Sequence, residues 1–236
     1  MSSRIVIGRH AVQALLNTHT PIEKLFVKER RMDNALNQLI ASAKSQRIAI
    51  QWLSNQQFNE RFSGDHQGIA CLTHDYPQMT VPELIAKAPN HILVLDHLND
   101  PHNVGAICRS AVAFGVSHLI YPKDRAVPLT PAVEKAAAGT MPSMTFTKVV
   151  NVGNTLRLLK KAGYWVYAAS SNTGSALPHT AFNTPLVLIC GAEHNGISPG
   201  LAPLVDEYVH IPMPGNTNSL NVSVATGIIL YAMTTN

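Results

Sequence analysis

The sequence predicts an α/β protein made of two α/β units. The chain has 236 residues, of which 46% are hydrophobic and only 14% are charged, so it can bury a sizeable core. Continuous apolar runs such as 92–95 are typical of strands buried on both faces of a sheet. Amphipathic segments alternate with these runs, and this order favours a parallel sheet covered by helices on both faces.

In the first third of the chain, the helix over 33–43 is the clearest element. Its apolar residues Ala35, Leu36, Leu39 and Ile40 have the i, i+3, i+4 spacing of an amphipathic helix. The other elements expected here are a helix over 10–17, strands over 22–27, 48–53 and 69–72, and a loop over 62–68. Together they predict a first domain over residues 1–75.

A proline-bearing segment separates this domain from the rest. Pro77, Pro82 and Pro89 predict a linker over 76–90 that contains a short helix over 82–88. The larger domain over 91–236 follows, and in its first part predicted strands and helices alternate. We expect strands over 92–95, 118–121, 144–149, 165–169, 186–190 and 208–211, and helices over 103–114, 131–138, 154–162 and 221–233.

The charge balance suits a polyanionic partner without demonstrating one. The formal net charge is +4 and the pI is about 9.0. Residues 1–75 hold nine Lys and Arg against six Asp and Glu, whereas 76–236 hold nine against eight. On charge alone, ordinary scatter is the better explanation of this difference, and the alternative is that the first third of the chain contacts a phosphate backbone. The high apolar fraction excludes a disordered chain, and the lack of charged heptads excludes a coiled coil.

The cysteines and histidines show no metal-binding or disulfide pattern. Cys71, Cys108 and Cys190 are far apart and odd in number, which excludes a disulfide framework and a structural zinc site. The eleven histidines stand singly, without metal-ligand spacing. No signal peptide and no membrane span are predicted, so we expect a cytoplasmic protein with no membrane partner.

Three loops that follow predicted strands carry unusual polar residues, at the sheet edge where α/β proteins bind ligands. In 96–109, Asp100 or Asn103 is the expected N-cap of the next helix. In 191–196, the spacing G-x-x-x-x-G lacks the lysine of a nucleoside-triphosphate site. In 211–223, Ser219 or Asn218 is the expected cap of the last helix. No G-x-G-x-x-G follows a strand, so a dinucleotide site is also excluded.

Taken in order, these motifs resemble the SpoU (TrmH-like) family of RNA ribose 2′-O-methyltransferases, which use S-adenosylmethionine (AdoMet) and belong to the SPOUT superfamily. The motifs are Asn-Val-Gly-Ala-Ile-Cys-Arg over 103–109, Leu-Ile-Cys-Gly-Ala-Glu-His-Asn-Gly over 188–196, and the segment 211–225. The resemblance covers all of 91–236. Residues 7–16 and 66–69 look like the small RNA-binding domain, similar to ribosomal protein L30e, that precedes the catalytic domain in many members.

The resemblance implies a SPOUT α/β-knot domain, with a C-terminal trefoil knot that holds AdoMet, and a homodimer. No metal is implied. Carried over to this sequence, the cofactor-binding residues are Gly191, Gly196, Ile211, Met213 and Leu220, and the catalytic residues are Asn103, Arg109, Glu193, Ser219 and Asn221.

In the family, the residue matching Arg109 acts on the ribose 2′-hydroxyl. Because arginine is effectively always protonated, we expect Arg109 to stabilise the developing alkoxide or to steer a nearby phosphate. Glu193 is expected to hold Arg109 or Asn103 through a charge-assisted bond. Alignment of the hydroxyl with the activated methyl group can supply about 7–11 kcal/mol of the barrier.

The resemblance is strongest to members that methylate a guanosine in the peptidyl-transferase P-loop of bacterial 23S ribosomal RNA. The expected partner is therefore 23S ribosomal RNA and not DNA. A family member acting on tRNA or on another rRNA nucleotide is the alternative, although the simplest tRNA enzymes lack the N-terminal domain. A non-catalytic RNA-binding protein for ribosome assembly is a third reading, which the joint presence of Asn103, Arg109, Glu193 and Asn221 disfavours.

Overall fold

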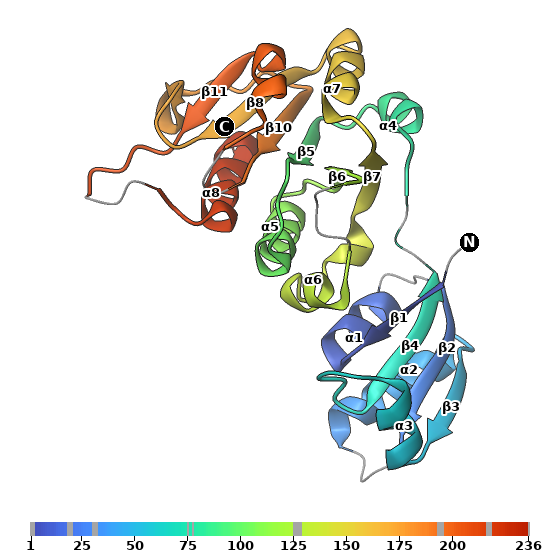
Figure 1. The fold of residues 1–236 in the computed structure, drawn as a ribbon. Helices are drawn as coiled ribbons and strands as arrows, with labels where there is room; N and C mark the ends of the chain where they lie inside the picture. Colours follow the sequence, from blue (N-terminus) through green and yellow to red (C-terminus); the bar gives the residue numbers. More distant parts are fainter. Residues whose placement is uncertain are drawn as a thin grey trace. The chain divides into compact units, whose positions relative to one another are not determined.

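The structure, a computed structural model, describes residues 3–17, 21–29, 33–74, 76, 78–124, 129–192, 196–215 and 219–235. The chain divides into two compact units. Unit 1 consists of Met1–Tyr76 and Ala138–Ser143, and unit 2 of Pro77–Ala137 and Met144–Asn236. Each unit has a sheet of its own (Figure 1).

Unit 1 is built on a four-stranded mixed sheet with the strand order β1-β4-β2-β3. Strand β4 is antiparallel to both β1 and β2, whereas β2 and β3 are parallel. Leu16, Leu25 and Leu36 belong to the core on the α1–α2 side, and Phe26 packs with Phe58 in a second cluster. The elements are β1 (Ser3–Ile7), α1 (Arg9–Asn17), β2 (Ile22–Lys28), α2 (Asn34–Ser45), β3 (Ala49–Leu53), α3 (Asn55–Arg61) and β4 (Ile69–His74).

Unit 2 contains, in its described part, a seven-stranded parallel sheet with the order β7-β6-β5-β10-β8-β11-β9. The predicted α/β class with a parallel sheet is therefore confirmed. Its strands are β5 (His91–Leu95), β6 (His118–Pro122), β7 (Thr145–Val149), β8 (Trp165–Ser170), β9 (Ser175–Ala176), β10 (Leu186–Cys190) and β11 (Glu207–His210). Its α-helices are α4 (Val81–Lys87), α5 (Pro101–Ala113), α6 (Pro131–Ala136), α7 (Val152–Lys161) and α8 (Val222–Thr235). Short 3-10 helices are η1 (Met141–Ser143, in unit 1), η2 (Leu177–His179) and η3 (Pro199–Leu204).

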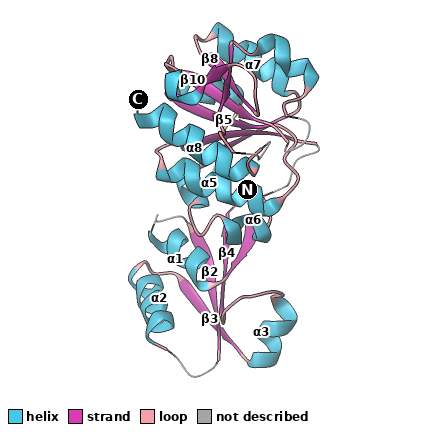
Figure 2. Ribbon diagram, turned by 90° about the vertical axis from the view of Figure 1, so that its left-hand side faces the viewer, coloured by secondary structure: helices cyan, strands magenta, loops and turns pink. Residues whose placement is uncertain are grey.

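Helices lie on both faces of the unit 2 sheet (Figure 2). On one face, α4, α7 and η3 contribute Leu84, Leu156 and Leu201 to a core that contains Val94 of β5 and Ile189 of β10. Helices α5 and α8 pack on each other at the opposite face. Strands β5 and β10 are covered from both sides, which explains why their sequences are continuously apolar.

The segment predicted as a linker, 76–90, is packed against unit 2 over much of its length. It includes α4, whose Leu84 side chain is fully buried. The Met79 N–H donates to the Phe146 carbonyl at 2.9 Å, and the Tyr164 hydroxyl donates to the Pro89 carbonyl at 2.9 Å. The prolines therefore shape a connection that has tertiary contacts of its own.

The strand order brings distant loops together. Strand β10 returns to lie between β5 and β8, and β11 lies on the far side of β8. All these strands are parallel, so the segments that follow β5, β8, β10 and β11 leave the sheet at the same edge. Within the described residues, no helix is long and apolar enough to cross a bilayer.

Candidate active site

A cavity of about 430 Å³ lies where β8, β10 and β11 end, against helix α8. Its wall combines backbone of a glycine loop with apolar side chains of α8. Six residues expected at the site line it, namely Gly191, Gly196, Ile211, Met213, Ser219 and Leu220. The segments after β10 and after β11 therefore meet at one cavity.

The glycine loop after β10 has no room for a side chain at its first position. A Cβ on Gly191 would lie 2.1 Å from the Gly196 carbonyl oxygen. The Gly196 N–H donates to the Ala192 carbonyl at 2.9 Å, which closes the loop, and Gly196 has a φ of +62°. The absence of a side chain at Gly191 therefore lets the backbone at the two ends of the loop, Gly191 and Gly196, pack closely together at the cavity wall. Residues 193–195, including Glu193, lie outside the described residues.

A pair of asparagines joins α5 to α8. The Asn221 Nδ2 donates to the Asn103 Oδ1 at 3.0 Å, and Asn103 is only 8% exposed. The Asn221 Oδ1 accepts from the Ser223 N–H at 2.9 Å and from its hydroxyl at 2.6 Å. Neither asparagine is among the residues that line the 430 Å³ cavity.

The helix caps differ in part from those predicted. Asp100 caps α5 by accepting from the His102 N–H at 2.9 Å, as one of the two alternatives had it. Asn221 caps α8, so Ser219 was the wrong choice, because the helix begins at Val222 and Ser219 stands too early to reach its first turn. Asn218 lies outside the described residues.

Arg109 lies on the exposed surface of α5 and is not a lining residue of the cavity. It makes no hydrogen bond or ion pair with any residue that the structure describes. Beside it, Ala106 and Ser110 line a shallow groove of about 480 Å³, whose other wall comes from α8. On that wall Val224, Ile228 and Tyr231 are 51%, 38% and 57% exposed.

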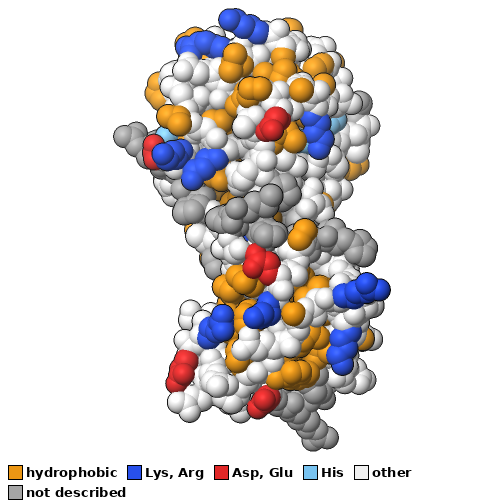
Figure 3. All heavy atoms as spheres, turned by 90° about the vertical axis from the view of Figure 1, so that its right-hand side faces the viewer, with side chains coloured by type: hydrophobic (Ala, Val, Ile, Leu, Met, Phe, Trp, Pro, Cys, Tyr) orange, Lys and Arg blue, Asp and Glu red, His pale blue; other side chains and the backbone are white. Residues whose placement is uncertain are grey.

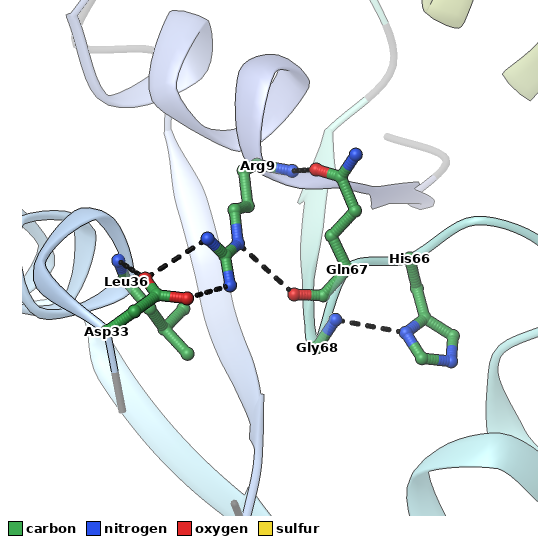
Figure 4. A network of polar contacts seen from close by, with 6 residues as sticks. All are labelled: Arg9, Asp33, Leu36, His66, Gln67 and Gly68. Atoms are coloured by element: carbon green, nitrogen blue, oxygen red, sulfur yellow. Dashed lines mark hydrogen bonds and ion pairs between the residues drawn. The ribbon is translucent and has the colours of Figure 1, made fainter. Parts of the chain in front are cut away.

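Unit 1 contains a polar network at the start of α1 (Figure 4). The Arg9 guanidinium donates to both carboxylate oxygens of Asp33 at 3.1 and 2.7 Å, and its Nε donates to the Gln67 carbonyl at 3.3 Å. Asp33 also caps α2, and the Gly68 N–H donates to the His66 Nδ1 at 3.0 Å. These bonds fix the loop before β4 against α1. Next to them lies a cavity of about 510 Å³, lined by Arg9, His10, Gln13, Ala35, Gln38, Leu39 and Gln67.

Comparison with known proteins identifies the family. The sequence profile of the SpoU rRNA Methylase family matches residues 90–231. The chain belongs to this family. A second profile, described as RNA 2′-O ribose methyltransferase substrate binding, matches residues 5–79. A protein of Staphylococcus haemolyticus assigned to the TrmH family of tRNA/rRNA methyltransferases is 34% identical over 237 residues, covering 98% of this chain and 95% of its own.

Solved structures of SpoU methyltransferases share the fold. AviRb from Streptomyces viridochromogenes, in complex with the cofactor AdoMet, superimposes with a TM-score of 0.80 at 20% identity, over 98% of this chain and 89% of its own. The AdoMet-bound rRNA methyltransferase from Sinorhizobium meliloti gives a TM-score of 0.78 at 21% identity, over 98% and 86% of the two chains. At such identities the likeness establishes the fold.

Several cavity residues of this SpoU family member are missed by sequence reasoning. Ser170 is the last residue of β8 and Ser171 follows it. Cys190 and Thr226 meet at the cavity wall, where the Thr226 hydroxyl donates to the Cys190 Sγ at 3.2 Å. Burial raises the pKa of Cys190 to about 12, so this residue contributes a neutral thiol to the wall. Two consecutive serines at the end of an apolar run are the signal that could have indicated that the end of β8 belongs to the site.

No group of three His, Cys, Asp or Glu side chains that could hold a metal ion occurs within the described residues.

Proposed function

We propose that this SpoU family protein transfers the methyl group of AdoMet to the 2′-hydroxyl of a guanosine ribose in bacterial 23S ribosomal RNA, as RlmB-type members do. One observation carries the proposal. In a chain that belongs to the SpoU family, all five residues matched to the cofactor motifs line a single cavity at the carboxyl edge of the parallel sheet.

The residues that line the cavity fit AdoMet. Backbone groups of Gly191, Ile211 and Leu220 offer hydrogen bonds to an adenine edge, and the Met213 and Ile229 side chains offer apolar surface to its ring. Gly196 lines the cavity and a Cβ there would meet no described atom within 4 Å, so this glycine lets a ligand approach the backbone closely. When bound, AdoMet supplies an already activated methyl group.

The chain itself must position and polarise the ribose hydroxyl. Arg109, which carries a full charge and five N–H donors, stabilises the oxygen as negative charge develops on it. Because Arg109 is exposed on α5 and does not line this chain's own cavity, it acts at the cavity of the partner subunit in the homodimer proposed below. Asn103 and Asn221, linked by their 3.0 Å hydrogen bond, hold the start of α5 against the start of α8. Glu193 is proposed to orient Arg109, and Ser219 to contact the substrate at the mouth of the cavity.

Unit 1 is proposed to be an L30e-like domain that binds the RNA, and 91–236 to be the methyltransferase domain. Support comes from the match of a substrate-binding profile to residues 5–79 and from the excess of basic residues over 1–75. On the face of unit 1 shown in Figure 3, Lys and Arg side chains border an apolar area. The cavity beside Arg9 adds polar side chains that suit contacts with RNA.

We further propose that the protein forms a homodimer through the groove between α5 and α8. The exposed apolar side chains of Val224, Ile228 and Tyr231 on α8 support this. A helix that is apolar on all sides needs to be buried on all sides, and a second subunit would cover the side that this chain leaves exposed. A change of Ile228 to Glu is expected to shift the protein to monomers in sedimentation velocity, whereas Lys161→Glu is the control. A sedimentation coefficient that is the same for the wild type and both variants contradicts the proposal.

The trefoil knot also stands as a proposal. Strand β10 inserts between β5 and β8, the chain then crosses to β11, and α8 returns to α5. This path supports a threaded C-terminal segment. The three cysteines, all buried and free, fit the reducing cytoplasm in which such an enzyme meets ribosomal RNA.

The deciding experiment supplies AdoMet with a labelled methyl group to the protein and unmodified 23S RNA. Nuclease digestion followed by mass spectrometry is expected to find one 2′-O-methylguanosine. Arg109→Ala is expected to abolish transfer while AdoMet binding by calorimetry persists, and Lys161→Ala serves as the control.

Other outcomes of this experiment separate the alternatives. Methylation of tRNA instead of 23S RNA would establish the second candidate, which the family match fits equally well. A methyl group on a base contradicts the reaction, and RNA binding without any transfer would favour the non-catalytic reading.

A further inference from the structure

One residue of the strand beside β10 holds both ends of the glycine loop. Strands β5 and β10 are parallel neighbours, with Leu95 opposite Cys190, and Asp96 directly follows β5. The Asp96 N–H donates to the Cys190 carbonyl at 2.9 Å, immediately before the loop. The Asp96 Oδ2 accepts from the Ser198 N–H at 2.6 Å, two residues beyond Gly196. Asp96 therefore connects the beginning of the loop to its end.

The two ends that Asp96 connects belong to the cavity of about 430 Å³ proposed for AdoMet, which we call the cofactor cavity. Cys190 and Gly191 line it from the first end, and Gly196 and Ile197 line it from the second. A Cβ on Gly191 would lie only 2.4 Å from the Ile197 nitrogen, so the two ends pack directly on each other. Asp96 is not among the residues that line this cavity. It can therefore act on a bound cofactor only through the loop.

The Asp96 carboxylate is buried, and each of its oxygens has a partner. The side chain is 1% exposed. Besides the bond from Ser198 to Oδ2, the His97 Nδ1 lies 2.5 Å from Oδ1. Because an ionised carboxylate can only accept, the His97 Nδ1–H is the donor of this bond. Burial of a carboxylate is costly even when it is paired, so packing alone would favour an apolar side chain at this position.

We propose that Asp96 is a positioning residue for the methyl transfer, which fixes the end of the glycine loop at Ser198 and thereby the wall of the cofactor cavity. The inference rests on the proposed function and adds to it a residue that does not touch the cofactor. Without the carboxylate, the Ser198 N–H has no acceptor, and the segment 196–198 is held less firmly beside Gly191. Only a fraction of the molecules then have the wall in the form that binds AdoMet, and the apparent affinity falls by that fraction.

Asp206 provides a matched control at the opposite edge of the same sheet. Its N–H donates to the Val166 carbonyl at 2.8 Å, and its Oδ2 accepts from the Val166 N–H at 2.9 Å. Its Oδ1 accepts from the Lys160 ammonium at 2.5 Å. Asp206 directly precedes β11 and Val166 is the second residue of β8, so this carboxylate also joins two neighbouring strands. None of these three residues lines the cofactor cavity.

The test compares AdoMet affinity, measured by isothermal titration calorimetry, with thermal stability. Asp96→Ala is expected to raise the Kd for AdoMet about tenfold, whereas Asp206→Ala is expected to keep it within about twofold of the wild type. Both variants are expected to lower the Tm, because each leaves a backbone N–H without its acceptor. A merely structural role of Asp96 would lower the Tm without this difference in affinity.

The conservative variant Asp96→Asn tests the role of the hydrogen bond to Ser198. The amide oxygen can still accept from the Ser198 N–H, and the amide NH₂ can donate to the His97 Nδ1 once the ring proton moves to Nε2. We therefore expect Asp96→Asn to bind AdoMet within about threefold of the wild type. A loss as large as that of Asp96→Ala would show that the hydrogen bond is not what positions the loop.

Turnover with 23S RNA separates positioning of the cofactor from the chemical step. In Asp96→Ala, we expect the KM for AdoMet to rise about tenfold and kcat to stay within about twofold of the wild type, since saturating cofactor restores the competent wall. A fall in kcat with an unchanged KM would overturn the inference, because the residue would then act on the reaction and not through cofactor binding.

Hydrogen exchange of the wild type supplies a measurement that needs no variant to fold. Without AdoMet, the Ser198 N–H is expected to exchange slowly, as the Val166 N–H does, and exchange at the rate of an unprotected amide overturns the inference. It is also overturned if folded Asp96→Ala binds AdoMet with the affinity of Asp206→Ala. That result, with a wild type that binds AdoMet and methylates RNA, refutes the role of Asp96 alone. A wild type that does not bind AdoMet refutes the proposed function itself.

Discussion

Replacement of Gly191 by alanine tests whether the glycine loop forms the cofactor wall. The new Cβ would lie 2.1 Å from the Gly196 carbonyl oxygen, 2.2 Å from the Gly196 carbonyl carbon and 2.4 Å from the Ile197 nitrogen. Close-packed atoms do not tolerate such distances, so the facing backbone has to move by about 1 Å. Overpacking of this kind costs about 1–3 kcal/mol. Since about 1.4 kcal/mol corresponds to a factor of ten, we expect AdoMet affinity to fall by about tenfold or more.

Two other glycines of the same region provide matched controls. A Cβ on Gly200 meets no atom within 4 Å, so Gly200→Ala is expected to bind AdoMet like the wild type. Gly196 also has open space but a φ of +62°, so Gly196→Ala tests conformational strain without a clash, at a cost of about 1–2 kcal/mol. Isothermal titration calorimetry gives the affinities, and thermal unfolding gives the stabilities. An AdoMet affinity of Gly191→Ala within twofold of that of Gly200→Ala would refute the reasoning.

Three further predictions concern the asparagine pair, the thiols and the histidines. Asn221→Ala removes the cap of α8 and is expected to lower the free energy of unfolding in urea by about 1 kcal/mol. Asn221→Asp keeps the cap but cannot donate to Asn103, so it is expected to lower turnover alone. Burial raises the pKa of Cys108 and of Cys190 to about 12, so at pH 8 about one thiol in ten thousand is ionised. The thiols of the native protein should therefore not react with Ellman's reagent until urea is added. Fast labelling of Cys190 in the native protein would contradict its burial. Burial, and in addition the positive charge of Lys87, lowers the pKa of His118 in the folded protein from its usual value of 6.5. Below pH 6.5 the unfolded state therefore binds more protons than the folded state. Stability should fall as the pH drops below 6.5, with a shallower fall in His118→Gln, and equal slopes for the two proteins would exclude this residue.

The parallel sheet could be predicted because each of its buried strands appears in the sequence as a local apolar run. The run 186–190 is apolar throughout, and β10 spans Leu186–Cys190 since it is covered on both faces. Two elements of unit 1 could not be predicted in this way. Strand β1 depends on antiparallel pairing with β4, where Ile5 lies opposite Leu72, a contact that no local pattern carries. Helix α3 has one buried side chain, Phe58, so its apolar periodicity is too weak to detect.

A different signal could have found α3. Ser54 and Gln57 form a capping box, in which the Ser54 hydroxyl accepts from the Gln57 N–H and the Gln57 side chain accepts from the Ser54 N–H. The spacing S-x-x-Q is visible in the sequence. The same lesson holds at the site. The asparagines at 103 and 221 were predicted as functional residues, but that Asn221 joins α5 to α8 while capping α8 depends on tertiary structure.

Helix α8 connects the proposed dimer to the proposed cofactor site. One side of this helix contributes Ala225, Thr226 and Ile229 to the cofactor cavity, and the other exposes Ile228 and Tyr231 at the groove with α5. A rigid helix cannot move one side without the other, so a partner subunit that fixes the outer side also fixes the cavity wall. Binding and association are then linked, and each must strengthen the other by the same factor. AdoMet is therefore expected to tighten the dimer in sedimentation experiments, and a variant that only weakens the dimer should lose AdoMet affinity although it touches no cavity residue.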